Sequence, residues 1–157
     1  MQSDGEEIKQ QLIFSGLLLM IFEQFKKFST STVEWFFSDN MEIKEGNVIH
    51  KRGLEFKEMI KKFGKAQSGQ HRNYTFRAAL CWFNSLDAIT KDELNEVERL
   101  YTLRNDVGHE LFNILVEDCK RAIEMEDILI VVNIFSKLIK WWFKEVEATT
   151  NPFFIEQ

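Results

Sequence analysis

Residues 90–114 have the sequence TKDELNEVERLYTLRNDVGHELFNI, and this stretch gives the strongest evidence for a helical fold. Thr90 and Glu93 have the spacing of a capping box, in which the hydroxyl and the carboxylate bind the free amides that begin a helix. Apolar residues then recur every three or four positions, as on one face of a helix. They are Val97, Leu100, Leu103, Val107, Leu111 and Ile114. The stretch therefore predicts a long helix that begins at about Lys91.

The segment that follows predicts another long helix, the last in the fold. Its apolar residues with helical spacing are Met125, Ile128, Val132, Phe135, Ile139, Trp142 and Val146. This spacing predicts that they form the stripe that faces the core. The opposite face is also apolar from Ile128 to Phe135, which favours a central position for this helix. Residues 148–157, with the Asn151-Pro152 pair, are expected to form a tail.

The beginning of the chain predicts a first helix with two apolar stripes. One stripe contains Ile8, Leu12, Ser15, Leu19 and Phe22, and the other contains Phe14, Leu18, Ile21, Phe25 and Phe28. A helix that is apolar on two sides has to pack twice. We therefore expect this helix either at the centre of the domain or against a second subunit, with residues 33–37 as its continuation.

The middle of the chain predicts shorter elements. Ser38 to Gly53, centred on Glu45-Gly46-Asn47, predicts an inserted turn or short hairpin. A helix over residues 54–63 is expected to end at Gly64 and to be followed by a polar loop over residues 65–71. Either Asn73 or Thr75 then caps a helix that contains Phe76, Ala79, Leu80, Phe83 and Leu86.

The composition agrees with this pattern. A hydrophobic share of 45% with 15 Phe is too high for a disordered chain, and one Pro with seven Gly provides few turns for a sandwich or barrel. We therefore expect an all-α bundle of four to five helices with a short inserted loop or hairpin. The length of 157 residues fits a single domain over residues 1–157, with its core at about residues 6–147.

The cysteines and the apolar run near the start exclude several classes of protein. Cys81 and Cys119 have no CxxC spacing, so buried reduced thiols are expected in place of a disulfide or a zinc site. The apolar run from Leu12 to Phe22 is shorter than the roughly 20 residues that span a bilayer. It also follows an acidic start, which argues against a secretory signal. A cytoplasmic protein that does not enter a membrane is expected.

Charge is distributed unevenly along the chain. The net charge of -5 argues against a protein that binds nucleic acid through its overall charge. However, Lys51 to Arg77 contains eight Lys or Arg and two Glu (8 − 2 = +6), whereas Lys91 to Asp127 contains five and eleven (5 − 11 = −6). Solvated surfaces are the ordinary explanation for both runs. The basic run is nevertheless the best candidate for phosphate contacts, through Lys61, Lys62, Arg72 and Arg77.

The candidate chemistry lies at Arg104 and His109, because the common phosphate-loop, metalloprotease, nucleophile-elbow and calcium-loop motifs do not occur. Histidine can accept or donate a proton near neutral pH, and a guanidinium can stabilise charge on a phosphate. A structural explanation is also open. In it, Arg104 pairs with an acid such as Asp106 or Glu110, and His109 is a partly buried helix residue.

Residues 103–111, LRNDVGHEL, resemble the signature of the HEPN family. That signature is an Arg, a polar residue directly after it, and a His four to six positions after the Arg, on a late helix of a bundle. Asn105 fills the polar position. Over the rest of residues 6–147 the resemblance is limited to architecture.

The resemblance implies a homodimer that places two such motifs at its interface and, in active members, cuts RNA without a metal or other cofactor. Arg104, Asn105 and His109 are then the catalytic residues, and the protein is a toxin or defence effector with a neutralising antitoxin as a further partner. Some family members carry Tyr two positions after the His, where a partner modifies it. Leu111 occupies that position here, so this modification is not expected.

Helix geometry complicates such a site. On a straight helix Arg104 and His109 point about 140° apart, whereas Asn105 and His109 lie on the same face. Either a distortion at Gly108 or a second subunit has to bring the two groups together, and we expect an interfacial site. Tyr101 and Asp106 are neighbours that could touch substrate, although packing is expected for Tyr101. The alternative functions are a non-catalytic module that binds nucleotide, RNA or a partner protein, and a dimeric scaffold.

Overall fold

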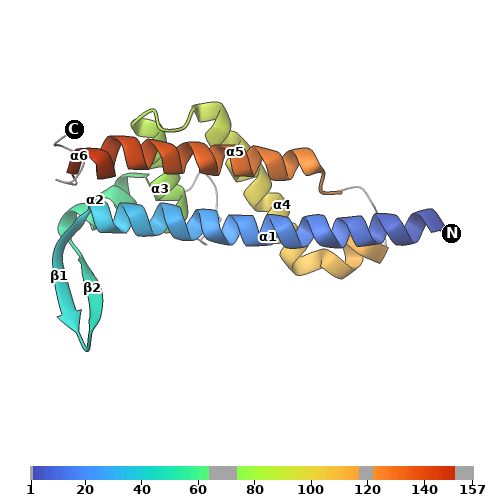
Figure 1. Ribbon diagram of the computed structural model, residues 1–157, viewed down its shortest axis with the longest axis horizontal. Helices are drawn as coiled ribbons and strands as arrows, with labels where there is room; N and C mark the ends of the chain where they lie inside the picture. Colours follow the sequence, from blue (N-terminus) through green and yellow to red (C-terminus); the bar gives the residue numbers. More distant parts are fainter. Residues whose placement is uncertain (1, 64–73, 117–121, 151–157) are drawn as a thin grey trace. The chain divides into compact units, whose positions relative to one another are not determined.

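The computed structural model describes residues 2–63, 74–116 and 122–150 (Figure 1). Its elements, in chain order, are α1 (Gln2–Phe36), β1 (Ser38–Lys44), β2 (Asn47–Arg52), α2 (Leu54–Phe63), α3 (Tyr74–Ser85), α4 (Lys91–Val116), α5 (Met125–Trp142), a π-helical turn η2 (Phe143–Glu147) and α6 (Ala148–Thr150). Within these ranges five helices have ten residues or more. The prediction of a helical fold with four to five helices and a short hairpin is confirmed.

The residues group into two compact units. Unit 1 contains residues 1–23 and 88–157, and unit 2 contains residues 24–87. Helix α1 contributes residues to both units, so unit 1 is built from two separate parts of the sequence. The single domain expected from the length of the chain stays a prediction.

In unit 1, α4 begins with the predicted capping box. The Thr90 amide donates to the Glu93 carboxylate at 2.7 Å, and the Glu93 amide donates to the Thr90 hydroxyl at 3.1 Å. Burial alone would raise the pKa of Glu93, but hydrogen bonds from Lys137 of α5 and from the Thr90 amide outweigh it and lower this pKa. The capping box therefore also joins α4 to α5, because Lys137 Nζ lies 2.7 Å from Glu93 Oε2.

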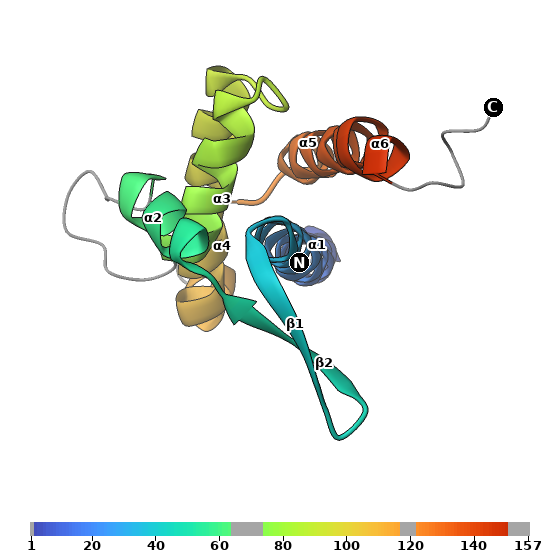
Figure 2. The same ribbon diagram turned by 90° about the vertical axis from the view of Figure 1, so that its left-hand side faces the viewer.

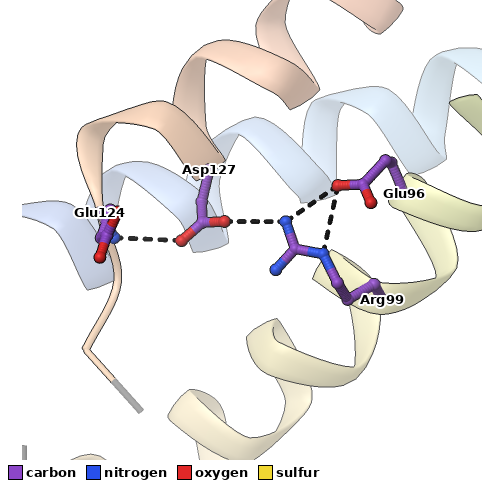
Figure 3. A network of polar contacts seen from close by, with 4 residues as sticks. All are labelled: Glu96, Arg99, Glu124 and Asp127. Atoms are coloured by element: carbon purple, nitrogen blue, oxygen red, sulfur yellow. Dashed lines mark hydrogen bonds and ion pairs between the residues drawn. The ribbon is translucent and has the colours of Figure 1, made fainter.

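A second polar network joins α4 to the start of α5 (Figure 3). Arg99 donates to Glu96 on its own helix and to Asp127 Oδ1 on α5, both at 2.9 Å from Nη2. The other oxygen of Asp127 accepts the Glu124 amide at 3.1 Å, which caps α5. Before α5, the side-chain amide of Gln11 in α1 forms two hydrogen bonds with the backbone of the buried residue Ile123. Gln11 Nε2 donates to the Ile123 carbonyl at 3.0 Å, and the Ile123 amide donates to Gln11 Oε1 at 2.9 Å.

The core stripe predicted for residues 125–146 is only partly right, because Val146 of η2 is buried as predicted but the buried face of α5 is shifted. Val131, Ile134 and Leu138 are buried together with Ile128 and Trp142. In contrast, Met125, Val132 and Ile139 are exposed, although the prediction placed them in the core. The physical reason is that apolar residues occur on more than one side of this helix, so periodicity alone does not select the buried face.

Helix α1 buries one face. Phe14, Leu18, Phe22, Phe25 and Val33 are buried at intervals of three, four or eight residues. Of the first predicted stripe, Ser15 and Phe22 are buried, but Ile8 and Leu12 are exposed. Ile8 and Leu12 are therefore not packed within the chain, and the alternative that this stripe packs against a second subunit stays a prediction. The predicted continuation over residues 33–37 is confirmed as far as Phe36.

Unit 2 contains the end of α1, the hairpin, α2 and α3. Phe36 and Phe37 contact the Trp82 ring of α3 with centroid distances of 5.1 and 5.4 Å, and Phe25 packs edge-on against Phe76 at 5.6 Å. Helix α2 contributes Phe56 and Met59 to the buried residues. Thr75 is the second residue of α3 and does not cap it, while Asn73 lies outside the described residues. Leu86 follows the helix and is exposed.

The hairpin confirms the turn that Glu45-Gly46-Asn47 predicted (Figure 2). Strands β1 and β2 are antiparallel, with Ile43 opposite Val48 and Lys44 opposite Asn47. Glu45 and Gly46 both have positive φ, 50° and 79°. Two central residues with positive φ define the tight turn that best matches strand twist, and glycine takes this conformation without strain.

Candidate functional site

The candidate site is organised around the guanidinium of Arg104 on α4. Its Nη1 donates to the side-chain oxygen of Asn105 at 3.0 Å, and its Nη2 forms an ion pair with Glu23 of α1. The Nε atom is buried and has no hydrogen-bond partner within the described part of the chain. Arg104 is half-buried, whereas Glu23 is exposed. One edge of the guanidinium is thus held by an amide and a carboxylate at the surface of unit 1.

The backbone of α4 continues without interruption past the candidate residues. Gly108 lies inside this helix, and a Cβ built there would meet only Leu19 Cδ2, at 3.9 Å. The distortion that would align Arg104 with His109 within one helix is therefore not found at Gly108. His109 follows Asn105 by one turn of α4, but its side chain lies outside the described residues.

Tyr101 and Asp106 flank Arg104 on the same helix. The Tyr101 ring packs against Phe22 of α1 with a centroid distance of 5.9 Å and an interplanar angle of 57°. This contact agrees with the packing role expected for Tyr101. Asp106 is half-buried, and the side chain of Glu110 is not described.

The basic residues proposed for phosphate contact belong to unit 2. Lys61 and Lys62 are exposed in the last turn of α2, and Lys62 Nζ lies 5.0 Å from the centre of the Phe63 ring. Arg77 of α3 is half-buried, and Arg72 lies outside the described residues. The structure thus brings Arg104 and Asn105 together in unit 1, with Tyr101 one turn before them.

Glu23 is the residue that sequence analysis missed. It pairs with Arg104 across 81 positions of sequence, whereas the acids considered from the sequence were close neighbours. Its one indication in the sequence is its place as the first charged residue after the apolar run from Leu12 to Phe22. That place predicts an acid at the edge of the buried face of α1, but it does not identify the partner.

The described residues contain no group of three His, Cys, Asp or Glu side chains that could hold a metal ion. The side chain of His109 is not among these described residues. None of the helices in the described ranges is long and apolar enough to span a membrane. Cys81 is half-buried on α3, and Cys119 lies outside the described residues.

Comparison with known proteins gave no match: no family model matches the chain, and no match was found among the curated proteins or the solved structures.

Proposed function

We propose that this chain is an endoribonuclease of the HEPN type that needs no metal, with Arg104, Asn105 and His109 as its catalytic residues. The observation that supports this most is the hydrogen bond of 3.0 Å between Arg104 and Asn105, on a helix that places His109 one turn further along. It holds a permanent cation beside a polar amide, next to a residue able to transfer protons. The resemblance of residues 103–111 to the family signature is the second support.

The chemistry requires proton transfer and charge stabilisation at one phosphate. The RNA 2'-oxygen forms a bond to phosphorus while its proton passes to a base, and the bond from phosphorus to the 5'-oxygen breaks as that oxygen gains a proton. A histidine side chain can accept or donate a proton near neutral pH, so His109 is the residue proposed for these transfers. Arg104 stabilises the charge on the phosphate oxygens, and the Asn105 NH2 group is available to bind one of them because its oxygen already accepts Arg104.

Helix geometry makes a homodimer part of this proposal. Because α4 is continuous, the backbone positions of residues 104 and 109 in one chain lie about 140° apart around the helix axis. A second chain can supply the missing group, as in a symmetric site where Arg104 of one protomer meets His109 of the other. A toxin or defence role, with an antitoxin that neutralises it, extends the same proposal.

The ion pair with Glu23 favours a second candidate function. A guanidinium held by a carboxylate must exchange that partner for a phosphate before it can act on RNA. If Arg104 serves mainly to fix α1 to α4, the surface suits a non-catalytic module that binds a nucleotide, an RNA or a partner protein. The two candidates differ in turnover, which an assay measures directly.

The test is RNA cleavage in excess EDTA by wild type, Arg104→Ala and His109→Ala. We expect both variants to lose cleavage by about 100-fold or more, the scale of a lost acid, base or charge-stabilising group. Arg99→Ala is the matched control, because Arg99 is on the same helix and bonds to acids outside the motif. RNA binding without cleavage by wild type supports the second candidate. A wild type that neither binds nor cleaves total RNA overturns the nuclease and the RNA-binding form of the second candidate.

Glu23→Gln separates a functional Arg104 from a structural one. Loss of the carboxylate frees the guanidinium, so the affinity for RNA rises if Arg104 binds phosphate. Glu7→Gln, on the exposed side of the same helix, is the control. Reduced stability with unchanged RNA affinity assigns Arg104 to the packing of α1 and α4.

A further inference from the structure

Helix α5 presents an exposed apolar face whose spacing is that of a coiled-coil seam. Met125, Leu129, Val132 and Ile139 of α5 and Phe143, the first residue of η2, are 47%, 51%, 38%, 41% and 48% exposed. The half-buried Ser136 completes the series. The intervals between successive members are 4, 3, 4, 3 and 4 residues. This alternation is the repeat by which one helix packs side chains into the gaps of another. We name these six residues the α5 seam.

The two edges of the α5 seam differ. One edge contains Glu126, Asn133 and Lys140, all exposed and seven residues apart. The other edge contains Ile128, Phe135 and Trp142, which are buried or half-buried within the protein. A partner helix therefore meets charge on one side only, with an acid at one end of that edge and a base at the other.

This pattern is complementary to itself when two copies of α5 run antiparallel. Met125 then lies opposite Phe143 of the second copy, Leu129 opposite Ile139, and Val132 opposite Ser136, because the numbers in each pair have the same sum. In an antiparallel pair the charged edges face each other, so Glu126 lies beside Lys140 of the second copy and the two Asn133 meet at the twofold axis. A parallel pair would instead set the charged edge against the apolar one.

We propose that the α5 seam is a homodimer interface in which two copies of α5 pack antiparallel about a twofold axis at Asn133. Charge complementarity favours a second copy of this chain over an unrelated helix. The register that places the apolar residues of the two seams opposite each other also pairs Glu126 with Lys140 on both sides of the twofold axis. The interface contains none of Arg104, Asn105 and His109. It is therefore a second contact between copies of the chain, separate from the contact proposed for the nuclease site.

The test is a charge swap, with the association of purified chains followed by sedimentation over about 1–100 µM, the range of moderate protein affinities. Glu126→Lys and Lys140→Glu each place like charges together twice per dimer, and we expect each to weaken association at least ten-fold. The double variant Glu126→Lys/Lys140→Glu restores wild-type affinity. An equimolar mixture of the two single variants forms a heterodimer, since every edge contact is then attractive.

Two controls separate the interface from folding. Lys144→Glu changes an exposed charge outside the α5 seam and its edges, so association is expected to stay at the wild-type level. Leu129→Asp places a charge in the seam at a residue exposed in the single chain, so it abolishes association while the helical content by circular dichroism is kept. A wild type that is monomeric throughout this range overturns the proposal. So does association that the single charge changes leave intact, or that the double variant fails to restore.

Discussion

Replacing Asp127 with alanine removes two contacts at the start of α5. One carboxylate oxygen accepts the Glu124 amide at 3.1 Å, and the other accepts Arg99 of α4 at 2.9 Å (Figure 3). The first contact caps the helix, and the second joins α5 to α4. We expect the free energy of unfolding to fall while the fold is kept.

The size of this effect follows from the two contacts. Loss of a cap costs about 0.5–2 kcal/mol. An exposed ion pair contributes about 0.2–1 kcal/mol, and the upper part of that range applies because the Asp127 side chain is only 14% exposed, against 50% for Arg99. We therefore expect Asp127→Ala to cost roughly 1–3 kcal/mol.

Asp127→Asn is the matched control, because it keeps an oxygen for the Glu124 amide and removes the charge that pairs with Arg99. It should cost at most about 1 kcal/mol. Equilibrium unfolding in urea, followed by far-ultraviolet circular dichroism, measures both variants, and a double-mutant cycle with Arg99→Ala isolates the ion pair. Equal losses for the two Asp127 variants, or two variants as stable as wild type, would refute this reasoning.

Three further perturbations test other parts of unit 1. Gln11→Leu leaves the buried backbone groups of Ile123 without their partners and should cost about 1–3 kcal/mol, measured by urea unfolding and by amide exchange at Ile123. Gly108→Ala should raise stability by about 0.5–1 kcal/mol, because α4 is continuous there and a Cβ has room; its urea midpoint measures this. The pKa of Glu93 is lowered in the folded state, so its contribution is complete above the ordinary value of 4.5 and is lost as the pH falls through the folded value. The stability difference between wild type and Glu93→Gln should therefore shrink in acid.

Each of these expectations has a distinct contrary result. Unchanged exchange at Ile123 in Gln11→Leu would show that the two hydrogen bonds do not protect that segment. A lower urea midpoint for Gly108→Ala would mean that the helix needs glycine there. A stability difference for Glu93→Gln that does not vary with pH would mean that the contacts to Lys137 and Thr90 do not favour the charged carboxylate.

Local features were predicted from the sequence in detail. The capping box of α4 depends on groups within four residues of each other, so Thr90 and Glu93 suffice to identify it. The hairpin turn is equally local, since Gly46 supplies the backbone conformation that the turn requires. In the capping box and in the turn, the residues that determine the local structure are all within a few positions of one another in the sequence.

Features that depend on distant residues were not predicted. The buried face of α5 is decided by what packs against it, and the run of residues 128–135, with one polar residue in eight, leaves that choice open. The partner of Arg104 is on α1, 81 positions away, where no local pattern identifies it. At the candidate site, the sequence therefore selected Arg104 and Asn105 but predicted neither the hydrogen bond between them nor the ion pair with Glu23.

The division of unit 1 between two parts of the sequence sets the order in which the chain can fold during its synthesis. Gln11 contacts Ile123, 112 positions later, and Glu23 contacts Arg104, 81 positions later. At roughly 5–20 residues per second a ribosome needs about 6–22 s to add 112 residues. Residues 24–87 are complete before any of the later half of unit 1 exists. The apolar residues at the start of α1 therefore stay exposed until the later part of unit 1 has been synthesised. A chaperone that binds apolar segments would act on the chain in this period.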